Sequence, residues 1–571
     1  TNLFTFMKII KLILSLSFLL VVSSLFGQKL KVKENHGEVF RPKSVNYLDV
    51  FESPEGGYFS VSYVPARRVL LIIPLKAKYY IQKFDDDMNF QREIMLNLES
   101  KGEKFKFYDL VQFGGRFYMF TTKADEQRGK LDLYYAELDV ESGQVTGDYT
   151  AVVSAEYVPQ NGYTYPSFKI SISENKEFLV VFSKNSQKVA KRSLFGRNRT
   201  TDDDDVGTYK FKFTFWLFDS NMREVMHEKD YVLKLENSTN EFYVQDFEVD
   251  DKGSIYILGK NAITDQLTRR ERKDAKRRSW LDIKQSAFVL EKINPDGSSE
   301  QQVTPEELLY LDMDILFDKE GNINLIGLVG EQVYYKLAAT GVNRLILTAE
   351  DLNVISEQTT NFTEEVLENV NNVLVVQNSL SDRKKKRVKR KEERLSDEQK
   401  AYNEISKRAA INVNTIAYSG LDEYGNASVV LEEYYVQVVT HTSTNANGGT
   451  TTTTTYYYHY DDLFMLKFFD DEVVQNSYKK SYTLVNASLD VSLNVVEQDG
   501  ELTIMTPGEV VRVDTELDRV VDYKLKAYDR SVRVPGLRKK TFFYKKVIDE
   551  NTILAPAQFR NKVAWYKFKV N

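Results

Sequence analysis

The chain has 571 residues, with 77 Lys and Arg against 83 Asp and Glu and a formal net charge of −6 at pH 7. It contains 35 Tyr and 34 Phe, only 11 Pro, and no Cys. This aromatic content excludes a disordered chain, and the absence of Cys excludes disulfides, thiolate metal ligands, cysteine nucleophiles and a lipid anchor on an amino-terminal cysteine.

Residues 7–28 have the layout of a secretory signal peptide. Lys8 and Lys11 precede an apolar run from Leu12 to Val22, and small residues lead to Gly27. We predict cleavage after Gly27, so that 1–27 are an upstream extension and signal peptide and 28–571 are the mature protein, in the periplasm or outside the cell. The alternative is an uncleaved anchor, but this run is shorter than the roughly 20 apolar residues of a transmembrane helix, and no later stretch reaches that length.

One phrase recurs along the chain: an apolar strand, a tight turn rich in Asp, Gly and Asn, and a second apolar strand. Its clearest copies are FEVDDKGSIYILG (247–259), ILFDKEGNINLIG (315–327) and GLDEYGNASVVLEE (420–433). Alternating β-branched and aromatic residues suit a half-buried pleated strand, while Asp and Gly supply the turn. Repeated hairpins of this kind predict a repeat architecture, and a β-propeller fits best.

Eight such turns can be placed, and the spacing of most of them suits one four-stranded unit each. They are predicted at 54–57, 113–115, 174–176, 251–253, 318–321, 422–425, 498–500 and 549–551. The sequence therefore predicts an all-β fold, a single propeller of eight blades, with seven as the alternative if the turn at Glu174 or the first turn is miscounted. The long interval between Gly321 and Gly425 must carry an insertion.

The last unit has only three strands, at 541–548, 552–559 and 563–570. Because a propeller suppresses open sheet edges, we expect residues 29–34, KLKVKE, to supply the missing outer strand and close the ring.

One unit resembles the bacterial β-propeller repeat family whose phrase is roughly Asp-x-x-Gly-Asn-x-Tyr-Val-x-Gly, followed by a strand that ends Asn-x-Asp-Gly. The matching residues are Asp250, Gly253, Tyr256, Gly259, Asn294, Asp296 and Gly297. Other units keep only the turn, and the whole chain is similar to uncharacterised secreted bacterial propeller proteins. The resemblance implies a fold and a compartment, and no reaction.

Long connections are predicted to leave one face of the blades, opposite the short turns. They include basic insertions at 186–209, 261–285 and 380–408, the last predicted as partly helical, and a low-complexity segment at 441–460. The basic tracts 186–209, 267–278 and 383–391 have net charges of +1, +5 and +8, so within a formal total of −6 the rest of the chain carries −20. Such polarity would attract anionic partners, although a solvated, mobile segment is the simpler interpretation of a charge run.

The candidate anion- or partner-binding residues all lie in two of these tracts. They are Arg269, Arg270, Arg272, Lys273, Arg277, Arg278, Lys384, Lys385, Lys386, Arg387, Lys389 and Arg390. The expected ligand is an envelope protein or an anionic glycan or glycolipid. Export and the lack of a stacking motif disfavour nucleic acid.

Tyr456, Tyr457 and Tyr458 follow a run of six Thr and could stack on sugar rings, but a long hairpin whose residues merely pair is the simpler interpretation.

No motif for catalysis, a metal or a cofactor is present. The four His occur at 36, 227, 441 and 459, and the sequence has neither a nucleophile elbow nor a phosphate-binding loop. We therefore predict a non-catalytic binding protein that presents a loop-rich basic face. The alternative is a carbohydrate-active enzyme, in which carboxylates from inner strands would converge within about 5–10 Å at the centre of the propeller.

Overall fold

The computed structural model describes residues 30–570 with gaps in the connections. The gaps are 70–72, 76, 126–128, 157–167, 186–209, 235–240, 267–280, 306–307, 334–335, 367–414, 445–449, 486–491, 507, 518–519, 526–540, 543–545, 550 and 560. The chain divides into two compact units. Unit 1 comprises Thr1–Phe59, Lys83–Gln91 and Ser492–Asn571, and unit 2 comprises Ser60–Gln82 and Arg92–Val491. Nearly all described elements are strands, and no described helix is long and apolar enough to cross a bilayer.

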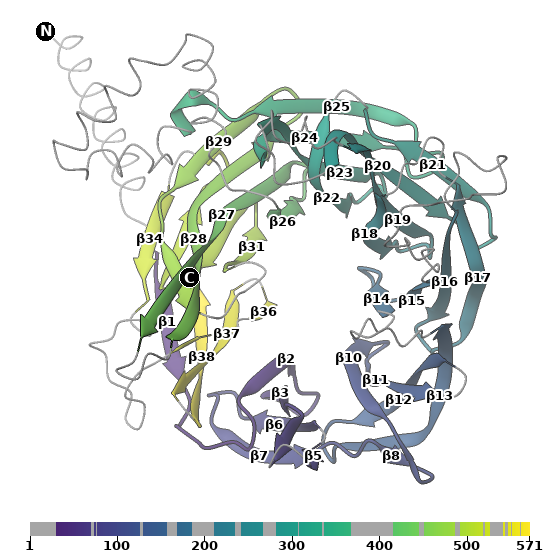
Figure 1. Ribbon diagram of the computed structural model, residues 1–571, viewed down its shortest axis with the longest axis vertical. Helices are drawn as coiled ribbons and strands as arrows, with labels where there is room; N and C mark the ends of the chain where they lie inside the picture. The colour runs from purple at the N-terminus through teal and green to yellow at the C-terminus, as the bar shows by residue number, and fades with distance from the viewer. Residues whose placement is uncertain are drawn as a thin grey trace, which may run out of the picture. The chain divides into compact units, whose positions relative to one another are not determined.

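Unit 2 contains five antiparallel sheets, each built from strands that follow one another along the chain (Figure 1). The first three are β10(Lys106–Phe113), β11(Arg116–Asp125), β12(Lys130–Asp139), β13(Gln144–Glu156); then β14(Phe168–Ile172), β15(Phe178–Asn185), β16(Lys210–Asp219), β17(Glu224–Lys234); then β18(Glu241–Val249), β19(Ile255–Gln266), β20(Leu281–Ile293), β21(Ser299–Val303). This up-and-down order of four neighbouring strands is that of a propeller blade.

The other two sheets of unit 2 follow the same order. They are β22(Leu309–Phe317), β23(Ile323–Val333), β24(Lys336–Leu347), β25(Val354–Asn361); then β26(Ile416–Leu421), β27(Ala427–Thr444), β28(Thr450–Phe468), β29(Val473–Tyr478), with β30(Tyr482–Val485) also paired to β28. A ribbon of β8(Glu99–Ser100) and β9(Glu103–Lys104) precedes β10.

Unit 1 contains a sheet of β31(Asn494–Gln498), β32(Glu501–Thr506), β33(Glu509–Val513) and β34(Val520–Lys524). Its second sheet joins β35(Thr541–Phe542), β36(Lys546–Asp549), β37(Thr552–Phe559) and β38(Lys562–Val570) to β1(Val32–His36). A further sheet, β2(Asn46–Glu52), β3(Tyr58–Val64), β6(Lys78–Phe84) and β7(Phe90–Met95), has residues in both units and is accompanied by the ribbon β4(Arg67–Val69) and β5(Ile73–Leu75).

The predicted turns join paired strands at all eight positions, and three of them share one geometry. Asp250, Asp318 and Asp422 each accept hydrogen bonds through Oδ1 from the backbone N–H groups two and four residues later, at 2.8–3.0 Å. The glycine that follows has φ between +82° and +85° in each case, a conformation that costs other residues free energy. The Asp and the Gly of the repeated phrase are therefore both explained by the turn.

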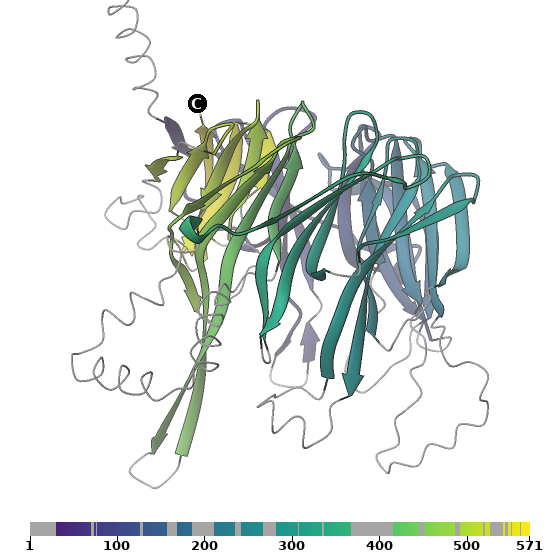
Figure 2. The same ribbon diagram turned by 90° about the horizontal axis from the view of Figure 1, so that it is seen from above.

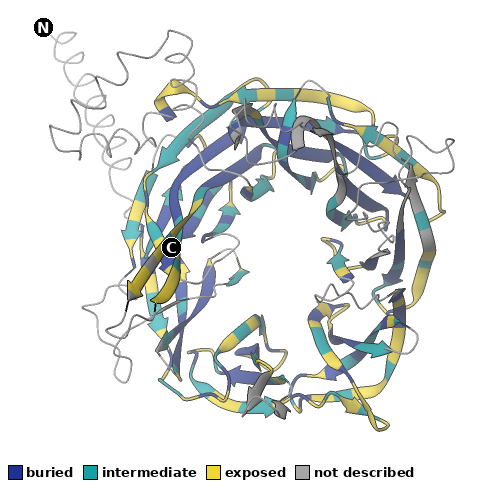
Figure 3. Ribbon diagram, in the orientation of Figure 1, coloured by how far each residue is buried: buried dark blue, intermediate teal, exposed yellow. Residues whose placement is uncertain are grey.

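Burial follows strand position within each sheet, as Figure 3 shows. The second and third strands are largely buried, whereas the fourth strands β21 and β25 alternate between exposed and half-buried residues. Neighbouring sheets pack face to face: in unit 2, for example, Phe182 of β15 stacks on Phe247 of β18 with ring centroids 4.8 Å apart. The many aromatic residues thus fill the space between sheets.

Strand pairing corrects three sequence expectations. Pairing continues through Asn261–Gln266 and Leu281–Ala287, so the insertion expected at 261–285 is shorter, because these β-branched and apolar residues extend the hairpin. Residues 441–444 and 450–460 are likewise paired strands, which shortens the long connection expected at 441–460 and confirms the long hairpin given as the simpler interpretation of this segment. The amino-terminal strand pairs with the last strand as expected, but it spans Val32–His36 and not 29–34.

Strand β1 contributes to the core of unit 1. Leu30 and Val32 are buried in one cluster with Ile553, Phe568 and Val570, while the side chain of Lys33 points to solvent. The alternation follows from the period of two in a strand.

We predict that Val32→Ser lowers the free energy of unfolding by about 2 kcal/mol, because it removes apolar burial and places a hydroxyl in the core. Lys33→Ser is the matched control and should change stability by less than about 0.5 kcal/mol. Urea unfolding of residues 28–571 measures both. Equal stability of the two variants would show that β1 does not pack against β38 in solution.

Candidate functional site

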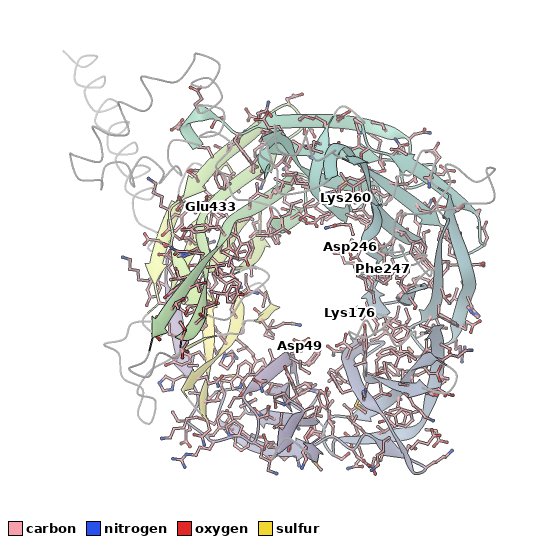
Figure 4. The ribbon with its side chains drawn as sticks, in the orientation of Figure 1. Asp49, Lys176, Asp246, Phe247, Lys260 and Glu433 are labelled. Atoms are coloured by element: carbon pink, nitrogen blue, oxygen red, sulfur yellow. The ribbon has the colours of Figure 1, made fainter. Side chains whose placement is uncertain are left out.

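The first strands of four consecutive sheets, β14, β18, β22 and β26, lie beside one another in unit 2. Acidic residues alternate along two of them: Asp246 and Glu248 on β18, and Asp312 and Asp314 on β22. Residues two apart in a strand share a face, so these side chains form a row, which we call the inner row. Figure 4 labels Asp246, which lies along the rim of unit 2 that carries the first strands.

Side chains of the inner row join β14 to β18. Ser171 Oγ donates a hydrogen bond to Glu248 Oε2 at 2.6 Å. Lys169 Nζ donates to the carbonyl oxygen of Gln245 at 3.2 Å and lies 4.0 Å from Asp246 Oδ1. These contacts hold the first strands of adjacent sheets together.

Asp312 joins three first strands. Its Oδ1 accepts a hydrogen bond from Gln245 Nε2 on β18, and its Oδ2 accepts from Thr415 Oγ1 at 2.7 Å and from the backbone N–H of Ile416 at 2.8 Å. Asp314 is linked to β26 as well, because its Oδ2 accepts from Ser419 Oγ at 2.8 Å. The acids of the inner row therefore have structural partners on both neighbouring sheets.

Burial gives two of these acids unusual proton affinities. Loss of solvent raises the pKa of Glu248 to about 7, opposed by the hydrogen bond from Ser171 and reinforced by the charge of Asp246. Loss of solvent also raises the pKa of Asp314 to about 7, with Asp312 and Asp246 adding to it. Near neutral pH each carboxyl group is therefore protonated in part of the molecules, as buried acids next to like charges are.

Lys260 lies at the same rim, as Figure 4 shows. Its Nζ donates a hydrogen bond to the carbonyl oxygen of Leu311 at 2.7 Å, and burial lowers its pKa. The inner row thus combines acids of raised pKa with a buried amine, which is an arrangement able to hold and exchange protons. Among the described residues no three His, Asp or Glu side chains are grouped to hold a metal ion.

A groove of about 640 Å³ lies next to the inner row and is formed by the turns that join the first and second strands of the same four sheets. Its lining carries seven acidic residues against two lysines. The charged residues are Glu174, Asp250, Asp251, Asp318, Glu320, Asp422 and Glu423, with Lys252 and Lys319. We call this the turn groove.

The acids of the turn groove have two different roles. Asp250, Asp318 and Asp422 accept hydrogen bonds within their own turns, so their charge is committed to structure. Glu320 and Glu423 are exposed at the tips of the turns. The exposed pair leaves negative charge available to a ligand that enters the groove.

The predicted basic residues at 269–278 and 384–390 lie outside the described residues, as do the proposed signal peptide, the tract 186–209 and the helix expected within 380–408. The ends of their flanking strands are described. The tract 267–278 connects β19 to β20, and 383–391 connects β25 to β26. Both connections leave the strands at the end opposite the Asp/Gly turns.

Tyr456, Tyr457 and Tyr458 lie on β28 in a long hairpin with β27. Tyr456 is exposed and the other two are half-buried, and the rings of Tyr456 and Tyr458 lie on one face with centroids 6.4 Å apart. The hairpin accounts for the pairing of these residues, and among the three rings that of Tyr456 is the most exposed.

From the sequence, carboxylates on inner strands were mentioned only as the feature that would distinguish an enzyme. The acids of the inner row were not named. The signal was present: Asp246 and Asp314 each stand four residues before the first Asp of a turn, and acids alternate from these positions. Asp49 occupies the same position before the first turn. The contacts between sheets could not be deduced, because they join residues far apart in the chain.

No protein-family model and no curated protein sequence matches this chain. Among solved structures it is similar to the β-propeller domain of the Trilobed protease from Pyrococcus furiosus, at 11% identity over 86% of this chain and 98% of that chain, with a TM-score of 0.33. It is also similar to the polysaccharide lyase Uly1, at 9% identity over 83% of this chain and 93% of that chain, with a TM-score of 0.33. A third similar structure is an acylaminoacyl peptidase from Pyrococcus horikoshii, at 10% identity over 90% of this chain and 58% of that chain, with a TM-score of 0.32. At such scores these likenesses carry no inference about activity.

The raised pKa values predict how stability depends on pH. The folded protein retains protons on Glu248 and Asp314 that the unfolded chain releases above pH about 4–5, so stability falls as pH rises from there to about 7 and then levels. Glu248→Gln and Asp314→Asn should each remove part of this fall in stability. Each should raise the free energy of unfolding by about 1–3 kcal/mol at pH 8 and by much less at pH 5.

Thermal unfolding across this pH range measures the effect. Glu331→Gln is the control, because Glu331 is exposed at the other end of β23. If the wild type and both inner-row variants had the same dependence of stability on pH, the raised pKa values of Glu248 and Asp314 would be contradicted.

Proposed function

We propose that this protein is an exported, non-catalytic binding scaffold of the bacterial envelope, built as a single eight-bladed propeller in which β1 completes the last blade. The sheet order supports the architecture, since four-stranded up-and-down sheets follow one another along the chain. The apolar run at 12–22 supports export.

The turn groove is the observation that carries the proposed binding role. Seven acids against two lysines line one concave surface, at the end of the strands opposite the entry points of the basic tracts. The scaffold is therefore proposed to have an acidic end and a basic end. The acidic groove suits a lysine- or arginine-rich segment of a partner protein, because opposite charge speeds encounter and selects the partner.

The basic tracts are proposed to bind an anionic envelope ligand, such as an acidic glycan or glycolipid. Arg269, Arg270 and Lys384 are examples of the residues that would contact it, and the exposed ring of Tyr456 offers a surface on which a sugar could stack. A scaffold with these two ends would connect a cationic partner to an anionic surface.

A carbohydrate-active enzyme is the second candidate, favoured by one observation. Glu248 and Asp314 have pKa values of about 7, which is a property of general acids in glycoside hydrolysis. The hydrogen bonds from Ser171 and Ser419 give both acids a structural role instead, so the binding role ranks first. If the protein released reducing ends from an acidic glycan and Glu248→Gln abolished this activity, the enzyme would rank above the binding role.

Charge reversal tests the turn groove. We predict that Glu320→Lys with Glu423→Lys weakens binding of a labelled deca-lysine peptide about 10-fold or more at about 50 mM salt, and that the effect shrinks at higher salt. The control is Glu331→Lys with one further exposed acid reversed, Glu228→Lys on β17, which lies outside the groove. Equal loss in the control would mean that net charge alone, and not the groove, attracts the peptide.

Neutralisation tests the basic end. Replacing the eight Lys and Arg of 383–391 by Gln keeps the length of the connection and removes eight positive charges. The variant should elute from heparin resin at lower salt than the wild type, because fewer anionic groups are neutralised on binding. Unchanged elution would remove this tract from the proposed ligand site.

A further inference from the structure

The hairpin of β27 and β28 extends beyond the rest of its sheet. Strand β26 pairs with β27 only up to Leu431, and β29 and β30 pair with β28 only at Leu463–Phe468 and Tyr457–Tyr460. Seven further pairs, from Val438↔Tyr456 to Thr444↔Thr450, have no third strand beside them in the described part of the chain. Figure 2 shows these two strands running past the others. We call Val438–Thr444 and Thr450–Tyr456 the arm.

The arm and its base are uncharged and partly apolar. No Asp, Glu, Lys or Arg occurs from residue 434 to 460, in a chain in which 28% of residues are charged. Val438 is 54% exposed, Val436 41% and Tyr456 43% on one face, and Val485 of β30 is 54% exposed nearby. Large apolar residues are seldom left exposed together on a strand without a partner.

The arm also lacks the features that normally protect edge strands from pairing with another chain. Charged side chains, Pro and β-bulges serve this purpose in natural sheets. The arm has no Pro, and the only register shift between β27 and β28 lies at its base, between Glu432 and Tyr434. Two uncharged edges rich in β-branched residues are therefore open to strand addition.

We propose that the arm pairs with the arm of a second copy of this chain, β28 beside β28, antiparallel about a two-fold axis. Charge argues for this occupant. Outside the three basic tracts the chain carries −20, so two copies repel wherever those surfaces approach. The uncharged arm extends away from its sheet and offers contact without like charges facing each other.

The sequence of β28 is compatible with pairing to itself. Thr450–Thr455 is a run of six Thr, so an antiparallel copy places Thr opposite Thr at whichever of these residues the axis lies. The hairpin already contains such pairs: the Oγ1 atoms of Thr440 and Thr454, and of Thr442 and Thr452, are 3.5 Å apart. Cross-strand Thr pairs stabilise a sheet, and a strand of this length, about 23 Å, gives a small interface and a weak dimer.

Introduced charge tests the proposal. Thr452→Lys with Thr454→Lys puts like charges opposite each other across the axis while leaving both residues exposed in the monomer. Sedimentation of residues 28–571 should show a mass that rises toward a dimer with concentration in the wild type, and association at least 10-fold weaker in the variant. The control, Thr146→Lys with Thr150→Lys, adds the same charge to the exposed outer strand β13 and should dimerise like the wild type.

Single cysteines locate the axis without relying on charge. Because the chain has no Cys, replacing each of Thr450–Thr455 by Cys in turn introduces one thiol, and only a residue opposite its own copy can form an intermolecular disulfide readily. We expect the variants nearest the axis to give a covalent dimer on mild oxidation, while Thr150→Cys does not. A chain that stays monomeric at every concentration, or a dimer unaffected by the Lys variant and not captured through β28, would overturn the proposal.

Discussion

The hydrogen bonds that each turn Asp accepts from two backbone N–H groups set the register on which the rest of the structure depends. When Asp250, Asp318 or Asp422 fixes its turn, the pairing of the two strands that the turn joins is fixed as well. A shift by one residue would exchange the buried and exposed faces of both strands. The turn therefore decides which residues reach the neighbouring sheet.

That register places the inner row and the turn groove next to each other. Asp246 and Asp314 stand four residues before their turns, so the same strands that end in the groove carry the acids that join adjacent sheets. The inner row holds together the sheets whose turns line the groove, but burying its carboxyl groups opposes folding. Glu248 and Asp314 weaken this effect by retaining protons, which links the packing of unit 2 to pH.

The local structure was accessible from the sequence because it rests on local chemistry. The eight turns follow from Asp, Gly or Asn between runs of alternating apolar residues, and the pairing of the amino-terminal segment with the last strand follows from the missing fourth strand of the last unit. The inner row was missed, since the partners of Asp312 lie 67 to 104 residues away. The long β27–β28 hairpin was predicted as the simpler interpretation of the Thr and Tyr run, because these residues have a high strand propensity.

The pairing of β1 with β38 has a consequence for synthesis. Strand β1 is synthesised roughly 530 residues before β38, its one partner in the described part of the sheet, a delay on the order of 25 to 100 s at about 5–20 residues per second. Throughout that interval Val32 and the rest of β1 lack the strand with which they pair. This sheet can therefore take its final form only after β38 has been synthesised, whatever the order in which the sheets of unit 2 fold.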